Sequence, residues 1–265
     1  MSTATPSRMP AVFFAHGTPM NALGENRFGD AWRHYGASIP KPKAILMVSA
    51  HWYTQGTAVT AMDAPRTIHD FGGFPQALFD MQYPAPGSPA LAARVHDLLA
   101  PVQVHMDRSW GLDHGTWSVL VHVYPRADIP VVQLSIDGTQ PPQFHYELAK
   151  RLAPLRDEGV LIAASGNVVH NLRTMRRSEQ AGAYDWAQQF ETTVREHLRR
   201  GEHAPLIDYE KLGQAARMSV PTPEHYLPLL YVMAQQQEGE PVSFITEGIE
   251  LGSISMLSVA IGATA

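Results

Sequence analysis

Histidine is the residue type through which this chain could do chemistry. The 265 residues include 13 histidines and no cysteine, so a metal site here would use imidazole or oxygen ligands and no thiolates. His16, His51 and His170 follow runs of apolar residues that are typical of buried strands. His114 and His225 lie in segments rich in glycine, proline and aromatic residues. If the strand ends share one edge of a sheet, several imidazoles meet there and could bind zinc, iron or copper.

The spacing of these histidines leaves a second interpretation open. They are too far apart in the chain to form a local motif such as H-E-x-x-H. On the residues alone, a shared metal site and a scatter of unrelated histidines are equally supported. We interpret two further histidines as structural, His105 and His122. We expect the histidines in helical or polar contexts to be solvated, namely His34, His96, His145, His197 and His203.

The apolar run Ala44–Trp52 predicts the strand around which the fold is organised. Five of its first six residues are apolar, and a continuous run of this kind suits a strand covered on both faces of a sheet. We expect this strand to end at His51. Similar runs predict further strands at 11–15, 57–61, 131–136, 160–165, 242–245 and 254–261.

Helical patterns alternate with these strands. They cover 26–39, a segment capped by Ser88 with Pro89 in its first turn, 143–155, 184–200 and 227–233. Two stretches rich in glycine and aromatic residues, 68–75 and 110–117, are expected to be loops. The alternation predicts an α/β fold, with residues 1–265 forming a single domain around a central, largely buried mixed sheet flanked by helices.

Charge and motif content exclude several function classes. The net charge of −5 does not favour binding to nucleic acid or to an anionic membrane surface. No run is long enough to span a bilayer, and the N-terminal residues lack the apolar core of a signal peptide, so we expect a cytoplasmic protein. Phosphate-loop and dinucleotide-binding motifs are absent, and Ser165 does not lie in a G-x-S-x-G elbow. The sequence leaves the oligomeric state open.

Seven blocks of sequence together resemble the DOPA-dioxygenase type of extradiol aromatic ring-opening enzymes, within the class III extradiol superfamily. They occur in the family's order and extend from residue 16 to residue 230. The blocks are HGTPMNAL (16–23), VSAHW (48–52), FGGFPQALF (71–79), YPAPGSP (83–89), GLDHGTWSVL (111–120), SGNVVHNLR (165–173) and PTPEHYLPLL (221–230).

The resemblance implies a pocket that binds one divalent metal ion and a catechol. It assigns the metal to His16, His51 and His225. It makes His170 either a fourth ligand or a base beside the metal, and His114 an acid–base residue. Many class III enzymes use two histidines and one glutamate, whereas the subfamily match favours His225 over its neighbour Glu224. Iron(II) is implied for turnover with O2, and zinc(II) fills such an imidazole site readily.

The expected activity is opening of a DOPA-like or small carboxylated catechol next to its hydroxyl groups. We expect the aromatic loops 69–74 and 110–117 to wall the pocket, because a ring substrate needs flat apolar surfaces. Two alternatives remain at this stage. One is a zinc-dependent hydrolase that uses the same histidines, and the other is a non-catalytic binding member of the fold.

Overall fold

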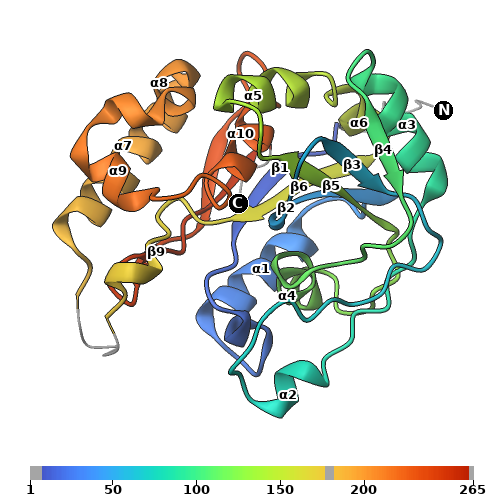
Figure 1. Ribbon diagram of the computed structural model, residues 1–265, viewed down its shortest axis with the longest axis horizontal. Helices are drawn as coiled ribbons and strands as arrows, with labels where there is room; N and C mark the ends of the chain where they lie inside the picture. The colour runs from blue at the N-terminus through green and yellow to red at the C-terminus, as the bar shows by residue number, and fades with distance from the viewer. Residues whose placement is uncertain (1–7, 177–181, 263–265) are drawn as a thin grey trace.

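A mixed sheet of eight strands forms the centre of the computed structural model, which describes residues 8–176 and 182–262. The sheet order is β4-β3-β5-β2-β6-β1-β10-β7, and a separate pair is formed by β8 and β9 (Figure 1). The strands are β1 (Ala11–Ala15), β2 (Ala44–Thr54), β3 (Thr57–Thr60), β4 (Val104–Asp107), β5 (Val131–Asp137), β6 (Val160–Gly166), β7 (Val242–Thr246), β8 (Ile249–Glu250), β9 (Ile254–Ser255) and β10 (Ser258–Ile261). The four central strands β5, β2, β6 and β1 are parallel, and antiparallel pairs flank them on both sides.

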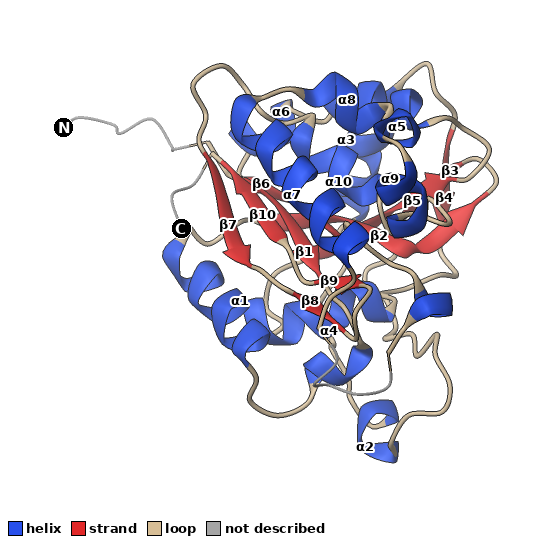
Figure 2. Ribbon diagram, turned by 90° about the vertical axis from the view of Figure 1, so that its left-hand side faces the viewer, coloured by secondary structure: helices blue, strands red, loops and turns tan. Residues whose placement is uncertain are grey.

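Helices cover both faces of this sheet, as the alternating pattern predicts (Figure 2). The α-helices are α1 (Arg27–Ser38), α2 (Gln76–Phe79), α3 (Pro89–Leu99), α4 (His114–Val123), α5 (Pro142–Lys150), α6 (Pro154–Asp157), α7 (Asp185–Arg200), α8 (His203–Ile207), α9 (Gln214–Ser219) and α10 (Leu227–Met233). Three short 3-10 helices are η1 (Pro19–Ala22), η2 (Leu172–Thr174) and η3 (Tyr209–Leu212). Within the described ranges, no helix combines the length and apolar character needed to cross a membrane.

The side chains at the start of β2 explain why its first five residues, 44–48, are all apolar. Leu46 and Val48 belong to the core cluster on the side of α3 and α10. Ile45 and Met47 belong to the cluster on the opposite side, with α1 and α4. Because successive residues of a strand point to opposite faces, a strand covered on both faces must be apolar at every position. The predicted fold class is therefore confirmed.

The prediction that β2 ends at His51 is wrong, because the strand contains a bulge and continues beyond this residue. Val48 pairs with Leu134 and Tyr53 pairs with Ile136, so β2 advances five residues where β5 advances two. The extra residues leave the ladder, and β2 then continues to Thr54. Bulges of this kind bend a strand and re-aim its side chains. His51 lies in the bulge and not at the strand end.

Three other predicted boundaries are wrong for local reasons. The predicted helix 143–155 is divided into α5 and α6, and α6 begins at Pro154, which has no N–H to continue a helical ladder. The predicted loop 110–117 ends early because Asp113 caps α4, accepting a hydrogen bond from the Thr116 N–H. The predicted strand 254–261 is two strands, of which β9 pairs with β8 and β10 joins the main sheet.

Several helix boundaries agree with the predictions. The Ser88 side chain accepts a hydrogen bond from the Leu91 N–H, and Pro89 is the first residue of α3. Asn26 caps α1 in the same way, through the Gly29 N–H. The last predicted helix is α10 with the same bounds. These ends are encoded locally, which is why the sequence alone locates them.

Gly166, at the end of β6, allows a close contact between two segments of the chain. A Cβ atom at this position would overlap the carbonyl oxygen of His225. The same oxygen accepts a hydrogen bond from the Asn167 N–H at 2.9 Å. The backbone of the turn that carries His225 therefore lies directly against the end of β6, and only glycine leaves room for this contact.

We predict that Gly166→Ala lowers the free energy of unfolding by about 1–3 kcal/mol, the usual effect of overpacking a buried contact. Urea unfolding followed by circular dichroism measures this change. Gly72→Ala is the matched control, because a Cβ at Gly72 meets no atom within 4 Å, and it should change stability by less than about 0.5 kcal/mol. Equal shifts in the two variants would contradict the packing argument.

Candidate active site

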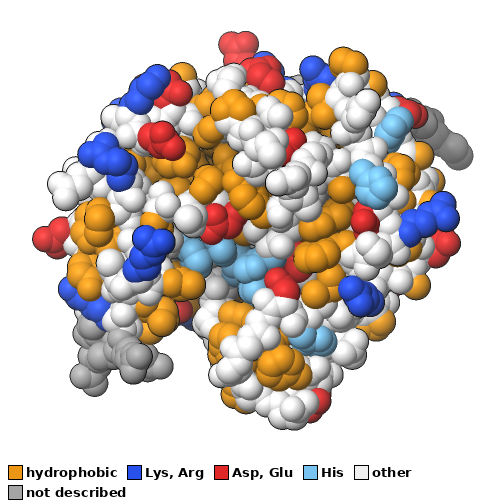
Figure 3. Space-filling model, in the orientation of Figure 1, with side chains coloured by type: hydrophobic (Ala, Val, Ile, Leu, Met, Phe, Trp, Pro, Cys, Tyr) orange, Lys and Arg blue, Asp and Glu red, His pale blue; other side chains and the backbone are white. Residues whose placement is uncertain are grey.

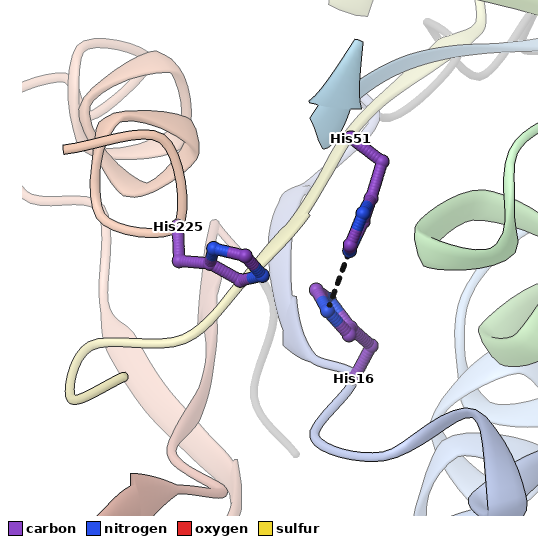
Figure 4. A group of neighbouring side chains, drawn as sticks. All are labelled: His16, His51 and His225. Atoms are coloured by element: carbon purple, nitrogen blue, oxygen red, sulfur yellow. Dashed lines mark hydrogen bonds between the residues drawn. The ribbon is translucent and has the colours of Figure 1, made fainter. Parts of the chain in front are cut away.

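Three histidines from distant parts of the chain point toward one another (Figure 4). His16 follows β1, His51 lies in the bulge of β2, and His225 lies in the turn before α10. One nitrogen from each of these rings lies within 4.8 Å of those from the other two. The Nε2 atoms of His16 and His51 are 3.2 Å apart. The carboxyl ends of the parallel strands β1 and β2 thus form one wall of this group.

His114 and His170 extend the group, so the structure brings all five predicted site histidines together. His114 is the first residue of α4, and its ring centroid lies 3.8 Å from that of His51. The His170 ring stacks on the His225 ring at a centroid distance of 3.5 Å and an interplanar angle of 9°. Two further sets of ligand atoms overlap with the set of three described above. His170 and Glu224 form a set with His225, and Asp70 and His114 form a set with His51.

A cavity of about 520 Å³ opens onto these five histidines. Figure 3 shows histidine side chains at the floor of a hollow bordered by hydrophobic side chains. The remaining lining residues are mostly apolar: Gly17, Thr18, Pro19, Phe71, Phe74, Leu172, Met175, Glu250, Leu251 and Ile254. The volume and lining are those of a site for a small organic ligand.

The aromatic loops wall this cavity only in part. Phe71 and Phe74 line it, as predicted. The prediction is wrong for the two tryptophans of the second loop. Trp117 lies in the first turns of α4 and is buried in the core, where its Nε1 donates to the Ile68 carbonyl. Trp110 stacks on Trp52 at 5.6 Å and 3°. The early start of α4 places Trp117 within that helix, where its ring lies 5.5 Å from the His69 ring and 6.2 Å from the Phe71 ring.

The three histidines whose nitrogens meet, His16, His51 and His225, each have a polar neighbour at Nδ1. Ser165 Oγ lies 2.8 Å from the Nδ1 of His16, and Glu224 Oε1 lies 3.2 Å from the Nδ1 of His225. Asp70 Oδ2 lies 3.3 Å from the Nδ1 of His51. These contacts lie on the side of each ring away from Nε2, the atom through which His16 and His51 approach each other.

Asp70 was not singled out by the sequence. Its Oδ1 atom lies 2.9 Å from the Nδ1 of His114 and accepts the backbone N–H of His114, also at 2.9 Å. Burial opposes ionisation of Asp70, but its contacts with His114 and His51 hold the pKa of this carboxyl below its usual value. The only signal in the sequence is its place directly before Phe71, at the start of an aromatic block.

Burial keeps four of these imidazoles, those of His16, His51, His170 and His225, neutral at pH 7. Desolvation, with smaller contributions from neighbouring histidines, lowers the pKa of His16 and His225 well below the usual value. The same desolvation, with His114 nearby, lowers the pKa of His51 to about 3, and burial lowers the pKa of His170 to about 4. Neutral imidazole is the form that binds metal ions and accepts protons.

A buried hydrogen-bond network centred on Asp113 joins the bulge of β2 to the start of α4. Ser49 Oγ donates to Asp113 Oδ1 at 2.6 Å, and Asp113 also accepts from the side-chain amide of Gln133. Burial raises the pKa of Asp113 to about 6. A Cβ at Gly115 would lie 2.5 Å from Ser49 Oγ and 2.8 Å from His51 Cδ2. The N-terminus of α4 and the bulge of β2 are therefore packed directly against each other.

The expectation that His145 is solvated is wrong. Its side chain is fully buried, and its Nδ1 lies 3.0 Å from the Tyr231 hydroxyl. α5 packs against α10 here, so a histidine on its inner face has no access to water. Two other histidines, His105 and His122, were interpreted as structural. His122 is buried, with its Nε2 2.7 Å from the Asn21 carbonyl oxygen, whereas His105 is exposed.

The donor set of the cluster suits a divalent metal ion. Two nitrogens that bind one tetrahedral ion at about 2.0–2.1 Å lie about 3.3 Å apart. The observed separation of 3.2 Å between the Nε2 atoms of His16 and His51 is close to this value. Together with His225, these residues form a set of three neutral donors that could hold such an ion.

Comparison with known proteins gives one consistent result. Residues 10–262 match the family described as the catalytic LigB subunit of aromatic ring-opening dioxygenase. The chain is 54% identical over 260 residues to the 4,5-DOPA dioxygenase extradiol of Escherichia coli (strain K12), covering 97% of this chain and 96% of that protein. It is 40% identical over 250 residues to the protein of the same name from Beta vulgaris, with 92% of each chain covered.

A solved structure agrees with these relatives. The crystal structure of an uncharacterized protein from Escherichia coli K12 superposes with a TM-score of 0.85 at 48% sequence identity, and covers 96% of this chain and 100% of that chain. The match extends over the whole sheet and over every element that carries a histidine of the cluster. The resemblance seen in the sequence is confirmed: this chain belongs to the LigB family of extradiol aromatic ring-opening dioxygenases.

Proposed function

We propose that this chain, acting as a single catalytic domain, opens the ring of a DOPA-like catechol next to its hydroxyl groups, with O2 as co-substrate. The observation that carries the proposal is the meeting of three buried, neutral imidazoles at the floor of an aromatic-walled cavity, in a member of this family. His16, His51 and His225 would hold one divalent metal ion. Relatives named for 4,5-DOPA support the choice of a DOPA-like substrate.

Iron(II) at this site would supply the acidity that deprotonates a catechol and the redox chemistry that consumes O2. The protein must bind the ring, keep out water and handle protons. A phenol hydroxyl has a pKa of about 10, so a catechol arrives protonated at pH 7. Phe71 and Phe74 offer the flat surfaces against which an aromatic ring can pack.

His114 is the proposed proton carrier. Its ring faces the cavity beside His51, and it stands outside the set of three nitrogens contributed by His16, His51 and His225. An imidazole side chain at this place can exchange a proton with a catechol hydroxyl during the reaction. His170, stacked on His225, is proposed as a second proton-handling group and not as a fourth ligand.

Oxygen uptake tests the proposal directly. Metal-free protein is loaded anaerobically with iron(II), a catechol is added, and O2 consumption and the absorbance of the ring-opened product are recorded. The proposal predicts uptake of one O2 per product, and none with zinc(II), which has no redox step. Ester hydrolysis by the zinc-loaded protein without O2 uptake would favour the zinc hydrolase instead.

We predict that His51→Gln abolishes stoichiometric metal binding, because it removes one of three ligands. Elemental analysis of the purified variant after iron(II) or zinc(II) loading measures the metal content. His105→Gln is the matched control, since His105 is exposed on β4 and should leave metal content unchanged. Full metal occupancy in His51→Gln would exclude His51 as a ligand.

We predict that His114→Gln keeps full metal occupancy and near-normal catechol affinity, while turnover falls about 10²–10⁴-fold, the usual contribution of a positioned acid or base. Steady-state O2 uptake and elemental analysis check the two parts separately. If this variant loses metal as His51→Gln does, His114 is a ligand. If turnover is unchanged, its role is structural.

His170→Gln separates the two roles left open for that residue. We predict retained metal and a turnover lowered by about 10²-fold or more, because a proton-handling group is lost while the three-nitrogen set stays intact. The same elemental and O2 assays apply. Loss of the metal from this variant would instead identify His170 as a fourth ligand.

A further inference from the structure

We propose that Leu251, at the tip of the β8–β9 hairpin, is a specificity-determining residue that packs against the side chain of a substituted catechol. The inference rests on the proposed function, because it takes the catechol hydroxyls to face the histidines. It deepens that function by naming the substrate class: catechols that carry an aliphatic side chain on a ring carbon away from the hydroxyl groups, in preference to catechol itself.

Leu251 has a backbone conformation that leucine rarely adopts. Its φ of 49° lies in the left-handed region, where a Cβ atom is crowded by the neighbouring backbone. Gly252 follows with a φ of 77°, and the Ser253 N–H donates to the Glu250 carbonyl at 3.2 Å. Positive φ at both central residues is typical of a type I′ turn, whose first central residue is usually asparagine, aspartate or glycine. A leucine at this place lowers stability, so we looked for what its side chain contributes.

Hydrogen bonds to a neighbouring segment hold this turn in place. The Arg176 N–H donates to the Leu251 carbonyl at 2.8 Å, and the Tyr184 N–H donates to the Gly252 carbonyl at 3.0 Å. A strained conformation persists only where the surrounding structure fixes it, and residues kept in this way are concentrated at functional sites. The two bonds therefore fix the place of the Leu251 backbone whichever side chain it carries.

The turn lies at the rim of the histidine cavity. Leu251 and Ile254 both line this cavity, and Ile254 forms a β-bridge with His170. Histidine side chains form the floor of the hollow (Figure 3). His16 and His225 are buried, whereas Leu251 is partly exposed. A catechol whose hydroxyls reach the floor therefore extends its side chain toward the rim.

The rim offers apolar surface to such a side chain. Leu172 and Met175 also line the cavity, and they are 60% and 42% exposed. Apolar residues left in water gain from contact with an apolar group of a ligand. A sphere with the cavity volume of about 520 Å³ is about 10 Å across. A catechol with a two-carbon side chain is about 7 Å long between its outermost heavy atoms, so a bound molecule can reach from the floor to Leu251.

Binding to zinc(II)-loaded protein tests this contact, because zinc has no redox step and the ligand is not consumed. Isothermal titration calorimetry under nitrogen compares catechol with 4-ethylcatechol, which adds an uncharged two-carbon side chain. We expect the wild type to bind 4-ethylcatechol more tightly than catechol. In Leu251→Ala, affinity for 4-ethylcatechol should fall about 10-fold, as for a lost apolar contact in a pocket, while affinity for catechol changes less than about 2-fold.

Ala127→Gly is the matched control for the backbone. Ala127 has the same φ of 49°, but it lies between α4 and β5 and does not line the cavity. Ala127→Gly, and the step from Leu251→Ala to Leu251→Gly, each remove one Cβ from the same conformation. Each should raise the urea midpoint of unfolding, because glycine adopts positive φ without strain. Only the Leu251 variants should weaken the binding of 4-ethylcatechol.

Three outcomes overturn the inference. One is a folded Leu251→Ala protein that binds 4-ethylcatechol within about 2-fold of the wild type. Another is an equal loss of affinity for catechol and 4-ethylcatechol, which would mean that Leu251 does not contact the side chain of the ligand. The third is a lower urea midpoint for Leu251→Gly than for Leu251→Ala, which would show that the turn is not strained. Absence of iron-dependent ring opening would instead overturn the proposed function, while the binding comparison would still decide the role of Leu251.

Discussion

The buried hydrogen bond between Ser49 and Asp113 is the contact on which the site depends. Ser49 lies in the bulge that re-aims His51, and Asp113 is the cap that starts α4 at His114. One bond of 2.6 Å therefore joins the two segments that carry these histidines. Asp113 is fully buried, and a buried carboxyl is tolerated only when its hydrogen bonds are made. Here Ser49, Gln133 and the Thr116 N–H all donate to it.

Burial also sets the protonation state of the cluster. Imidazoles this close could not all be charged, since like charges in a desolvated site repel strongly. Desolvation removes the conflict by lowering the pKa of His16, His51 and His225, so each ring stays neutral. A neutral ring has one nitrogen that donates and one that accepts. Desolvation therefore makes these rings able both to bind a metal ion and to accept a proton. Which of these roles a ring has depends on the residues around it.

The parts of the site that the sequence did not predict share one property: they depend on contacts between distant segments. Asp70 is in contact with His114 although 44 residues separate them. The loop of Asp70 carries no periodic pattern, so nothing local shows where its carboxylate points. Trp117 looks like a pocket residue by composition, yet the cap at Asp113 starts a helix that turns its ring into the core. His145 looks solvated by composition and is buried because α5 packs on α10.

The sequence by itself predicted the fold class, the central strands and the five histidines that the structure brings together. These follow from local information: continuous apolar runs identify strands covered on both faces, caps locate helix starts, and ordered blocks of sequence indicate the family. Only the tertiary structure decided which ring nitrogens lie close together, namely those of His16, His51 and His225. The bulge in β2 and the backbone contact of Gly166 with the turn of His225 bring the rings within reach of one another. Such contacts depend on register and close approach between distant segments, which no local pattern encodes.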